Sequence, residues 1–414
     1  MIRLSTRGQA KSHFQDVRIG RITTVPIGAA ARGDHVFLVG PSTQKPDTFG
    51  YAGVVVLPGA ETPETETPLA QVGDELGYLA DGDVVLLAPS GRVSVLYRKA
   101  SRHNTILSTE RCNSLCLMCS QPPQLEDDSY RVGEILRLIE LIDAGCVELG
   151  ISGGEPLLLG DGFFAIVKKC KELLGTTALH VLTNGRLFKD PRLARRLGEI
   201  HHPDIMLGIP LYADVDTIHD YVVQVRGAFD ETVVGLYNLA QNQVPIEIRV
   251  VLHAQTYRRL PQLAEYIYRN FPFVSHVALM GLEMFGYTNI NLSDLWIDPV
   301  DYQSELRTAT LKLAERGLNV SIYNHQLCTI PQDLWPFARQ SISDWKNIFV
   351  AECEGCEVRG ACAGFFHSAA KRHSAHIKPT SVRPEILRAL VGSVPSRIEV
   401  GTPLAEDAAD PVRN

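Results

Sequence analysis

The sequence predicts an α/β protein: a partial (β/α)6 TIM-like barrel with a β-rich domain before it and a cysteine-rich region after it. Between residues 104 and 324, short apolar runs alternate with longer amphipathic segments, as expected for a parallel sheet covered by helices. The first 100 residues are rich in Gly, Pro and β-branched residues, which favour strands and turns. Beyond residue 326 the alternation fades. We therefore predict domains at 1–100, 101–326 and 327–376, with a tail at 377–414.

The N-terminal domain is predicted to contain strands and no helix. Ala88-Pro89-Ser90-Gly91 is typical of a hairpin turn between the last two strands, and 58–68 reads as a polar loop. The predicted strands are 35–40, 51–57, 84–88 and 92–98.

The barrel is predicted from six strand–helix units and a final strand. In such barrels the functional residues gather where strands end, so the segments that follow the strands are the candidate site. The predicted strands are 105–110, 146–152, 178–184, 204–211, 246–253, 276–283 and 319–324, and the predicted helices are 131–145, 163–175, 191–200, 230–242, 260–271 and 299–317.

Bulk composition excludes several classes of function. The chain has 414 residues, 45% of them hydrophobic, and a formal net charge of −7 with no lysine–arginine run, which argues against a nucleic-acid partner. No apolar stretch approaches the roughly 20 residues of a membrane helix, and the first residues lack the apolar core of a secretion signal. We expect a cytoplasmic protein without a membrane partner. The polar, Pro-containing tail 377–414 is typical of disordered segments.

Nine cysteines, an odd number without an export signal, argue against a disulfide framework. Cys146 and Cys170 stand alone in apolar patterns, and we interpret both as packing residues.

Cys112, Cys116 and Cys119 form a C-x3-C-x2-C run directly after the first barrel strand. A four-iron cluster normally takes four cysteine ligands, so three would leave one iron open to a small molecule. The alternative is a structural zinc site, which favours a closed set of four ligands.

Two further motifs end the second and third barrel strands. Gly153-Gly154-Glu155-Pro156 offers close backbone approach and a carboxylate for an ammonium group, although Pro also favours the first position of a helix. Thr183-Asn184-Gly185 could be an ordinary turn.

Together these motifs resemble the radical S-adenosylmethionine (SAM) superfamily over about residues 104–366. The resemblance implies that Cys112, Cys116 and Cys119 bind a [4Fe-4S] cluster whose open iron chelates SAM. It implies further SAM contacts through the residues Met118 (adenine), Gly153, Gly154, Glu155 and Pro156 (methionine amino group), Asn184 (ribose or substrate) and Arg249 (ribose and adenine).

The fourth-strand region departs from the pattern of radical SAM peptide maturases, in which S-L-D-G precedes H-D and R-G. His219-Asp220 and Arg226-Gly227 match, but Pro210, Tyr212 and Ala213 replace the serine, aspartate and glycine. The alternative interpretation of the matching pairs is helix capping and a surface ion pair. His325, Glu283, Asp298 and Tyr323 are candidates by position only.

A second cysteine group is C-x2-C-x5-C with one cysteine upstream. It resembles a truncated SPASM/twitch-like motif, in which Phe366 stands where a further cysteine is usual. The resemblance implies a second, auxiliary [4Fe-4S] cluster, and zinc is the alternative. The four cysteines are Cys328, Cys353, Cys356 and Cys362.

Within the superfamily, the stretches CNSLCLMCSQPP, LTNGRLF, IPLYAD, VALMGLEM and NHQLC…CAGFF resemble the maturases of His-Xaa-Ser repeat peptide systems. That resemblance implies a substrate peptide, a second radical SAM maturase and a low-potential electron donor as partners. It implies reductive cleavage of SAM to a 5′-deoxyadenosyl radical, which abstracts hydrogen from the peptide in a net oxidative modification such as a crosslink.

Two other functions stay open from the sequence. A radical SAM enzyme for a small, nucleotide-derived substrate would need basic residues at the barrel mouth, for which Arg186 and Arg249 are the candidates. A zinc-stabilised peptide-binding protein is the alternative that is not an enzyme.

Overall fold

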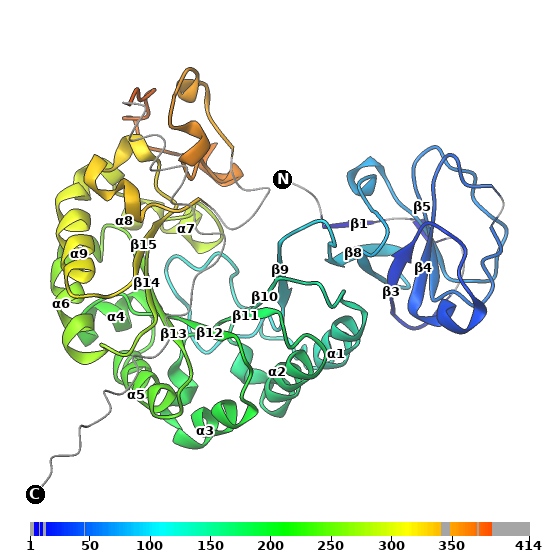
Figure 1. Cartoon of the computed structure of the whole chain (residues 1–414), viewed down its shortest axis with the longest axis horizontal. Coiled ribbons are helices and arrows are strands. Elements are labelled where there is room, and N and C mark those ends of the chain that lie inside the picture. The colour runs from blue at the N-terminus through cyan, green and yellow to red at the C-terminus, as the bar shows by residue number, and fades with distance from the viewer. Residues whose placement is uncertain are drawn as a thin grey trace, which may run out of the picture.

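The computed structural model describes residues 4–7, 9–10, 14–44, 46–340, 348–370 and 372–382. Two sheets organise them, an eight-stranded N-terminal sheet and a seven-stranded sheet in the larger part of the chain (Figure 1). The predicted α/β class, with a partial barrel after a β-rich region, is confirmed.

The N-terminal sheet closes on itself through the first residues of the chain. β1 (Ser5–Arg7) pairs with β8 at one end of the strand order, and β2 (Gln9–Ala10) pairs with β6 at the other. The strand order is β1-β8-β7-β3-β4-β5-β6-β2, with β3 (Arg18–Thr23), β4 (His35–Val39), β5 (Gly53–Val56), β6 (Leu69–Gln71), β7 (Val84–Leu87) and β8 (Arg92–Tyr97).

All four strands expected in this region form, and the predicted hairpin joins β7 to β8. Gly91 adopts a left-handed φ of 82° in that turn. The prediction missed β3, whose residues mix charged and apolar types without a clear alternation. It also missed β1, β2 and β6, which are only two or three residues long. The expectation of no helix was wrong in detail, since short 3₁₀ helices form at Ala29–Asp34 and Asp74–Leu76.

The second sheet is entirely parallel and follows chain order, as the alternating pattern predicts. Its strands are β9 (His103–Leu107), β10 (Glu148–Ser152), β11 (Ala178–Leu182), β12 (Ile205–Pro210), β13 (Ile246–Leu252), β14 (His276–Gly281) and β15 (Val320–Tyr323). The helices between them are α1 (Arg131–Leu141), α2 (Asp161–Leu173), α3 (Pro191–Ile200), α4 (Asp216–Val223), α5 (Ala228–Gln241), α6 (Leu260–Asn270), α7 (Tyr287–Ile290), α8 (Leu292–Leu295) and α9 (Gln303–Glu315).

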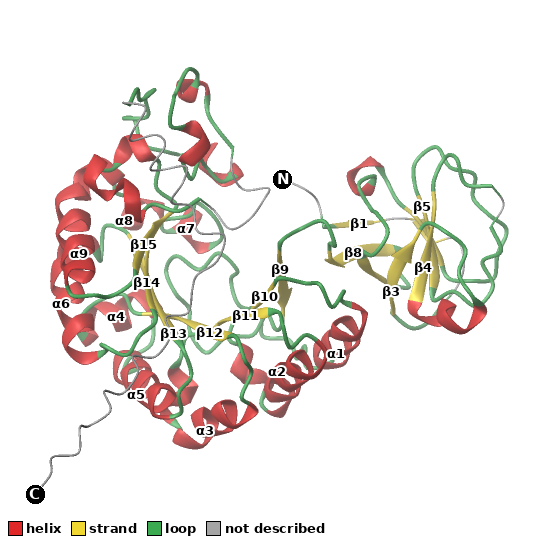
Figure 2. Ribbon diagram, in the orientation of Figure 1, coloured by secondary structure: helices red, strands yellow, loops and turns green. Residues whose placement is uncertain are grey.

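The sheet is strongly curved, and the long helices cover its convex side (Figure 2). Apolar residues of alternate strand positions, such as Ile151, Val181, Leu207 and Ile248, pack against those helices in the largest core. The intervening positions face the concave side, where the segment after β9, cyan in Figure 1, also lies. The carboxyl ends of the strands therefore open onto that segment.

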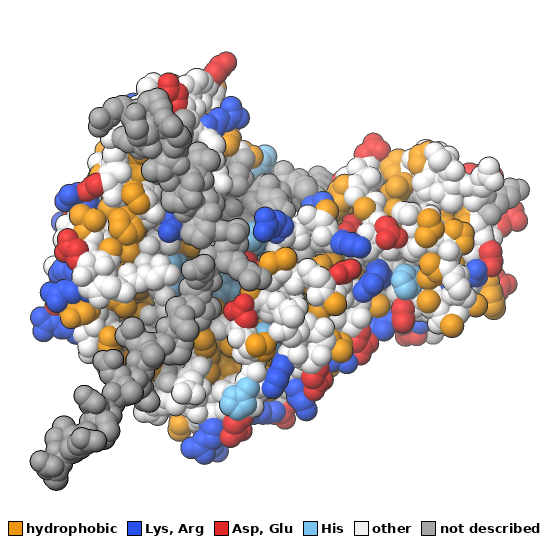
Figure 3. Space-filling model, viewed as in Figure 1, with side chains coloured by type: hydrophobic (Ala, Val, Ile, Leu, Met, Phe, Trp, Pro, Cys, Tyr) orange, Lys and Arg blue, Asp and Glu red, His pale blue; other side chains and the backbone are white. Residues whose placement is uncertain are grey.

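The N-terminal sheet packs against the first barrel helix. The Arg21 guanidinium donates two hydrogen bonds to the Leu141 carbonyl at the end of α1, at 2.9 and 2.5 Å. Val84 and Tyr97 of the first sheet belong to the same buried core as the barrel. Over the face shown in Figure 3, Lys and Arg side chains are interspersed with Asp and Glu.

The described residues after β15 form short 3₁₀ turns and loops. The first residues of the predicted disordered tail are ordered here. Ile377 is buried, and the Thr380 carbonyl accepts a hydrogen bond from the Glu357 N–H at 3.1 Å. The rest of that tail, 383–414, lies outside the described residues. No helix of the described ranges is long and apolar enough to cross a membrane.

Candidate functional site

The cysteine loop 112–119 is held on the concave side by other loops at the strand ends. The N–H groups of Leu115 and Leu117 donate to the carbonyls of Val223 and Val222, at 3.1 and 2.9 Å. The Cys119 carbonyl accepts from the Tyr287 N–H at 2.8 Å. The loop is therefore fastened to segments that follow β12 and β14 as well as to its own strand.

The three thiols of this loop are partly buried. Burial raises the pKa of Cys112 to about 11 and that of Cys116 to about 12, and it also raises the pKa of Cys119. For Cys116 the neighbouring thiols Cys112 and Cys119 add to the shift. A metal centre binds thiolates and displaces the protons, so three weakly acidic thiols gathered in one loop suit a site that is charged only when metal is bound.

Gly153 and Gly154 lie directly against the backbone that leads into Cys112. A Cβ on Gly153 would come within 2.4 Å of the Thr109 carbonyl oxygen, and one on Gly154 within 2.1 Å of the Arg111 carbonyl oxygen. The Gly154 and Glu155 N–H groups donate to those same carbonyls, both at 2.8 Å. The absence of side chains at these two positions thus brings the 153–155 loop against the cysteine loop.

Glu155 is fully buried and its carboxylate joins two loops of the site. Its Oε1 accepts from the Leu157 N–H at 3.0 Å and from the Thr183 hydroxyl at 2.8 Å, and its Oε2 accepts from the Asn184 N–H at 2.7 Å. Burial raises the pKa of this carboxyl, while these hydrogen bonds act in the opposite direction. Pro156 also begins a 3₁₀ helix, Pro156–Leu159, capped by Glu155, so the turn interpretation of this motif holds alongside its place in the site.

Asn184 brings the third strand end to the cysteine loop. Its side-chain Nδ2 donates to Oδ1 of Asn113 at 2.6 Å and lies 3.9 Å from the Cys112 sulfur. Two motifs that the sequence places 72 residues apart are therefore in direct contact.

Arg186 is buried beneath the same loop. Its guanidinium donates to the Asn113 carbonyl and, at 3.0 Å, to the Ser114 hydroxyl. Its other side pairs with Glu231 of α5 at 2.8 Å. From the sequence, Arg186 is a candidate phosphate ligand. In the structure its guanidinium forms an ion pair with the Glu231 carboxylate instead.

The two other predicted SAM contacts, Met118 and Arg249, already have partners within the fold. Met118 packs against Tyr212, Val222 and Leu295, and its carbonyl accepts from the Thr288 hydroxyl at 3.3 Å. Arg249 of β13 pairs with buried Glu247 at 2.7 Å.

The fourth-strand motif serves packing and helix capping. The Tyr212 N–H donates to Nδ1 of His219 at 3.3 Å, and burial lowers the pKa of His219 to about 4. Asp220 accepts the Gly227 N–H and, at 2.8 Å, the Phe229 N–H at the start of α5. Capping of α5 thus explains the presence of Asp220 and Gly227 in this motif.

The structure also brings the four cysteines of the second group together. Cys328, Cys353, Cys356 and Cys362 line one small cavity together with Arg359 and Lys378. Burial raises the pKa of Cys328, and nearby Cys353 and Cys356 add to that shift. The Cys362 sulfur accepts two backbone N–H groups at 3.5 Å, from Leu327 and Gly364.

The remaining candidates are structural or distant. His325 is buried, with Nε2 bonded to the Tyr302 hydroxyl at 2.9 Å and Nδ1 to the Tyr323 carbonyl at 2.8 Å. Asp298 caps a 3₁₀ helix through Val300. Cys146 and Cys170 are buried in the main core, as expected of packing residues. Within the described ranges, no three His, Cys, Asp or Glu side chains are grouped as ligands of one metal ion.

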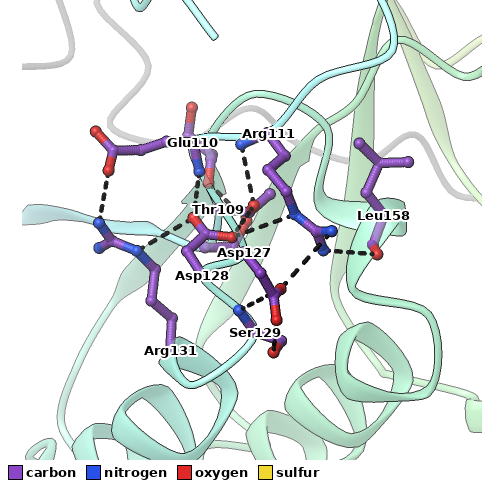
Figure 4. Close-up of polar contacts among 10 residues, drawn as sticks. Thr109, Glu110, Arg111, Asp127, Asp128, Ser129, Arg131 and Leu158 are labelled. Atoms are coloured by element: carbon purple, nitrogen blue, oxygen red, sulfur yellow. Dashed lines mark hydrogen bonds and ion pairs between the residues drawn. The ribbon is translucent and has the colours of Figure 1, made fainter. Parts of the chain in front are cut away.

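Sequence reasoning missed a buried carboxylate beside the site (Figure 4). Asp128 is 5% exposed and accepts from the Thr109 hydroxyl and the Glu110 N–H, both at 2.7 Å. Burial alone would raise the pKa of Asp128, but the hydrogen bonds and the charges of Arg131 and Arg111 lower it overall. In the sequence it is one of several acidic residues in a polar loop, and nothing marks it as buried.

Comparison with known proteins decides the family of the central region. The model of the Radical SAM superfamily matches residues 106–267. These residues form a radical SAM domain. The cysteine loop and the 153–155 and 183–185 loops all lie within it.

Curated relatives match this chain over part of their length. A "Probable GTP 3',8-cyclase" of Methanopyrus kandleri is 26% identical over 168 residues, which are 38% of this chain and 50% of that protein. A "GTP 3',8-cyclase" of Thermodesulfovibrio yellowstonii is 33% identical over 88 residues, 19% of this chain and 26% of that protein. The chain thus spans half of the first relative and about a quarter of the second.

Similar solved structures include SuiB of Streptococcus suis bound to its precursor peptide SuiA. It has a TM-score of 0.43 and 20% identity, and the match covers 54% of this chain and 48% of SuiB. Native anSMEcpe with bound AdoMet and the Cp18Cys peptide has a TM-score of 0.41 and 19% identity, covering 53% and 62%.

Proposed function

We propose that this protein is a radical SAM enzyme that modifies a ribosomally made peptide by hydrogen abstraction, with net oxidation of the peptide. The observation that carries the proposal is the contact of the three-cysteine loop with the two-glycine loop at the carboxyl ends of β9 and β10. A [4Fe-4S] cluster with three cysteine ligands supplies one electron to SAM, whose cleavage yields the hydrogen-abstracting 5′-deoxyadenosyl radical.

The chain's own residues prepare this site. Cys112, Cys116 and Cys119 would hold the cluster, and the 153–155 backbone would bind the methionine part of SAM. Glu155 is already bonded to three donors, so its first task is to fix the 153–155 and 183–184 loops. Among the described residues, Oε2 accepts one hydrogen bond, from the Asn184 N–H, which leaves acceptor capacity for an ammonium group.

Charge favours a peptide over a nucleotide in the concave site. The two arginines that could bind a triphosphate are each neutralised, Arg186 by Glu231 and Arg249 by Glu247. Moving either guanidinium to a phosphate would break its ion pair and leave Glu231 with only Lys189, and Glu247 with only histidines such as His276, as partners.

We propose that Cys328, Cys353, Cys356 and Cys362 bind a second [4Fe-4S] cluster, which would accept the electron released when the peptide is oxidised. Backbone N–H groups directed at the Cys362 sulfur suit a thiolate ligand. Arg359 and Lys378 at the cavity would offset the negative charge of such a centre. Zinc on the same thiols is the alternative, and metal analysis with sulfide determination distinguishes the two.

The proposed partners are a short peptide with His-Xaa-Ser repeats, a second radical SAM maturase and a low-potential electron donor. They rest on the sequence motifs CNSLCLMCSQPP and NHQLC…CAGFF. The N-terminal sheet, residues 1–100, is proposed as a separate domain of this enzyme.

A small-molecule substrate is the second candidate, because the curated relatives that match the radical SAM region are described as GTP 3',8-cyclases. The test is anaerobic incubation with SAM, a reductant and either GTP or the repeat peptide, followed by mass spectrometry. A peptide that loses mass in pairs of hydrogens supports the proposal. A modified nucleotide together with an unchanged peptide would contradict the proposal and support the small-molecule substrate instead.

A further inference from the structure

We propose that Asp128 is a positioning residue that fixes the cysteine loop against the 153–155 loop and so sets how tightly SAM binds. The inference rests on the proposed function. Asp128 belongs to none of the motifs discussed above, and it lies in the loop before α1 rather than at a strand end.

Asp128 accepts two hydrogen bonds from the residues that lead into the cysteine loop. Its two oxygens accept separate donors, Thr109 Oγ1 on Oδ1 and the Glu110 N–H on Oδ2, both at 2.7 Å (Figure 4). Hydrogen bonds to a charged, buried acceptor are stronger than neutral ones. The backbone immediately before Cys112 is thus fixed at two consecutive residues.

Two arginines lie beside the Asp128 carboxylate. The Arg111 Nε lies 3.5 Å from Oδ1 and the Arg131 Nε lies 3.3 Å from Oδ2. Arg131 also pairs with Glu110 at 2.8 Å, and Arg111 donates to the Leu158 carbonyl at 3.3 Å. Leu158 belongs to the 3₁₀ helix that follows Glu155. Asp128 therefore sits at the centre of a network that spans both loops.

The same network reaches the loop proposed to bind SAM. The carbonyls of Thr109 and Arg111, on either side of the Glu110 N–H that Asp128 accepts, in turn accept the N–H groups of Gly154 and Glu155 at 2.8 Å. Cys112 follows Arg111 directly. One buried carboxylate thus sets the distance between the first cysteine and the backbone proposed to hold the methionine part of SAM. Such outer partners of metal ligands typically change affinity or activity by about 10–100-fold when removed.

Asp128→Asn is the sharpest change, because it keeps the shape and removes the charge. If the new NH2 group faces Glu110, two donors oppose each other. If it faces Thr109, the hydroxyl must turn and its proton loses its acceptor, since Thr109 Oγ1 already accepts the Arg111 N–H at 3.1 Å. The first orientation loses one hydrogen bond, the second leaves the Thr109 hydroxyl proton without its acceptor, and in both the two arginines lose their shared counter-charge.

Asp127→Asn is the matched control. It makes the same chemical change one residue away, at a carboxylate that is 71% exposed and 3.8 Å from Arg111. An ion pair this exposed contributes little. Asp127 otherwise bonds Ser129 within its own loop.

The experiment is a SAM titration of the reduced, reconstituted full chain, followed by electron paramagnetic resonance, with the thermal midpoint measured in parallel. Wild type and Asp127→Asn should show the same SAM-dependent change in the spectrum. Asp128→Asn should need about ten-fold more SAM for half of that change and should make correspondingly less 5′-deoxyadenosine at low SAM concentration.

Thr109→Val and Thr109→Ser test the same link if Asp128→Asn fails to fold, since only the serine keeps the hydroxyl. The serine variant should titrate like wild type and the valine variant like Asp128→Asn. Wild-type titration of Asp128→Asn or of Thr109→Val, even with a lowered thermal midpoint, overturns this inference and leaves the proposed function standing. A wild-type spectrum that does not respond to SAM overturns both.

Discussion

Asn184 donates its backbone N–H to Oε2 of Glu155 at 2.7 Å, which joins the loops after β10 and β11. The same asparagine bonds Asn113 of the cysteine loop through its side chain. Three strand ends therefore depend on one buried carboxylate, and a change there should affect the whole site.

Glu155→Gln should disrupt this arrangement although it is nearly isosteric. Oε1 and Oε2 each face a backbone N–H, from Leu157 and Asn184, so the amide NH2 opposes a donor in either orientation. We expect a loss of about 1–3 kcal/mol of stability and a reduced rate of 5′-deoxyadenosine formation. Glu199→Gln, on the exposed surface of α3, is the control. Normal SAM cleavage by the Glu155 variant would argue against its proposed place in the site.

Gly154→Ala should be far more damaging than a glycine substitution elsewhere. Its Cβ would lie 2.1 Å from the Arg111 carbonyl oxygen, so the backbone before Cys112 must move. We expect loss of iron at the three-cysteine loop together with loss of 5′-deoxyadenosine. Gly133→Ala in α1, where a Cβ meets no atom within 4 Å, should be neutral or stabilising. Equal iron content in the two variants would contradict the packing argument.

Much of the barrel could be predicted because its strands are continuous apolar runs. β12 and β14, for example, are buried along almost their whole length, which is typical of parallel strands covered by helices. Helix α4 was not expected, because His219-Asp220 was interpreted as a motif rather than as part of a helix. Closure of the N-terminal sheet depends on two- and three-residue strands, which carry no pattern.

The cysteine, glycine and Thr-Asn-Gly motifs could be identified because the chemistry needs those residue types at fixed spacings. Their supporting contacts could not. Arg186 and Glu231 meet across 45 residues, and Asp128 meets Thr109 across 19. Each is an ordinary polar or charged residue in the sequence, and only burial in the folded chain selects its partner.

Cys356→Ala should separate SAM cleavage from peptide modification. Cys356 lines the second cysteine cavity and lies apart from the radical SAM motifs in the sequence. We expect 5′-deoxyadenosine to form at close to the wild-type rate while the oxidised peptide disappears. Cys146→Ala, a change at a cysteine in the main core, should keep both products. An unchanged yield of peptide product from the Cys356 variant would refute a redox role for this site.

Stability should fall on acidification, in part because of His253. Burial lowers the pKa of His253 to about 4 from an ordinary value of 6.5. Between these two pH values the unfolded chain binds a proton that the folded chain does not, so stability rises with pH in this window and levels off above it. The full contribution is of the order of 3 kcal/mol.

The check is thermal or urea unfolding from pH 7 to pH 4.5 for wild type and His253→Asn. Asparagine can still accept the Gln255 N–H that Nδ1 now accepts at 3.3 Å, so the variant should show a shallower dependence on pH. His201→Asn, at an exposed position with a left-handed φ of 50° that asparagine tolerates, should keep the wild-type slope. Identical slopes for all three proteins would refute the assignment.

The most direct test of the central claim is the yield of 5′-deoxyadenosine when anaerobically reconstituted protein is reduced in the presence of SAM. Wild type should form 5′-deoxyadenosine and methionine in equal amounts, and Cys116→Ala should form neither. Wild-type protein that carries a full complement of iron and sulfide and yields no 5′-deoxyadenosine, or a Cys116→Ala variant that yields as much as wild type, would contradict the account.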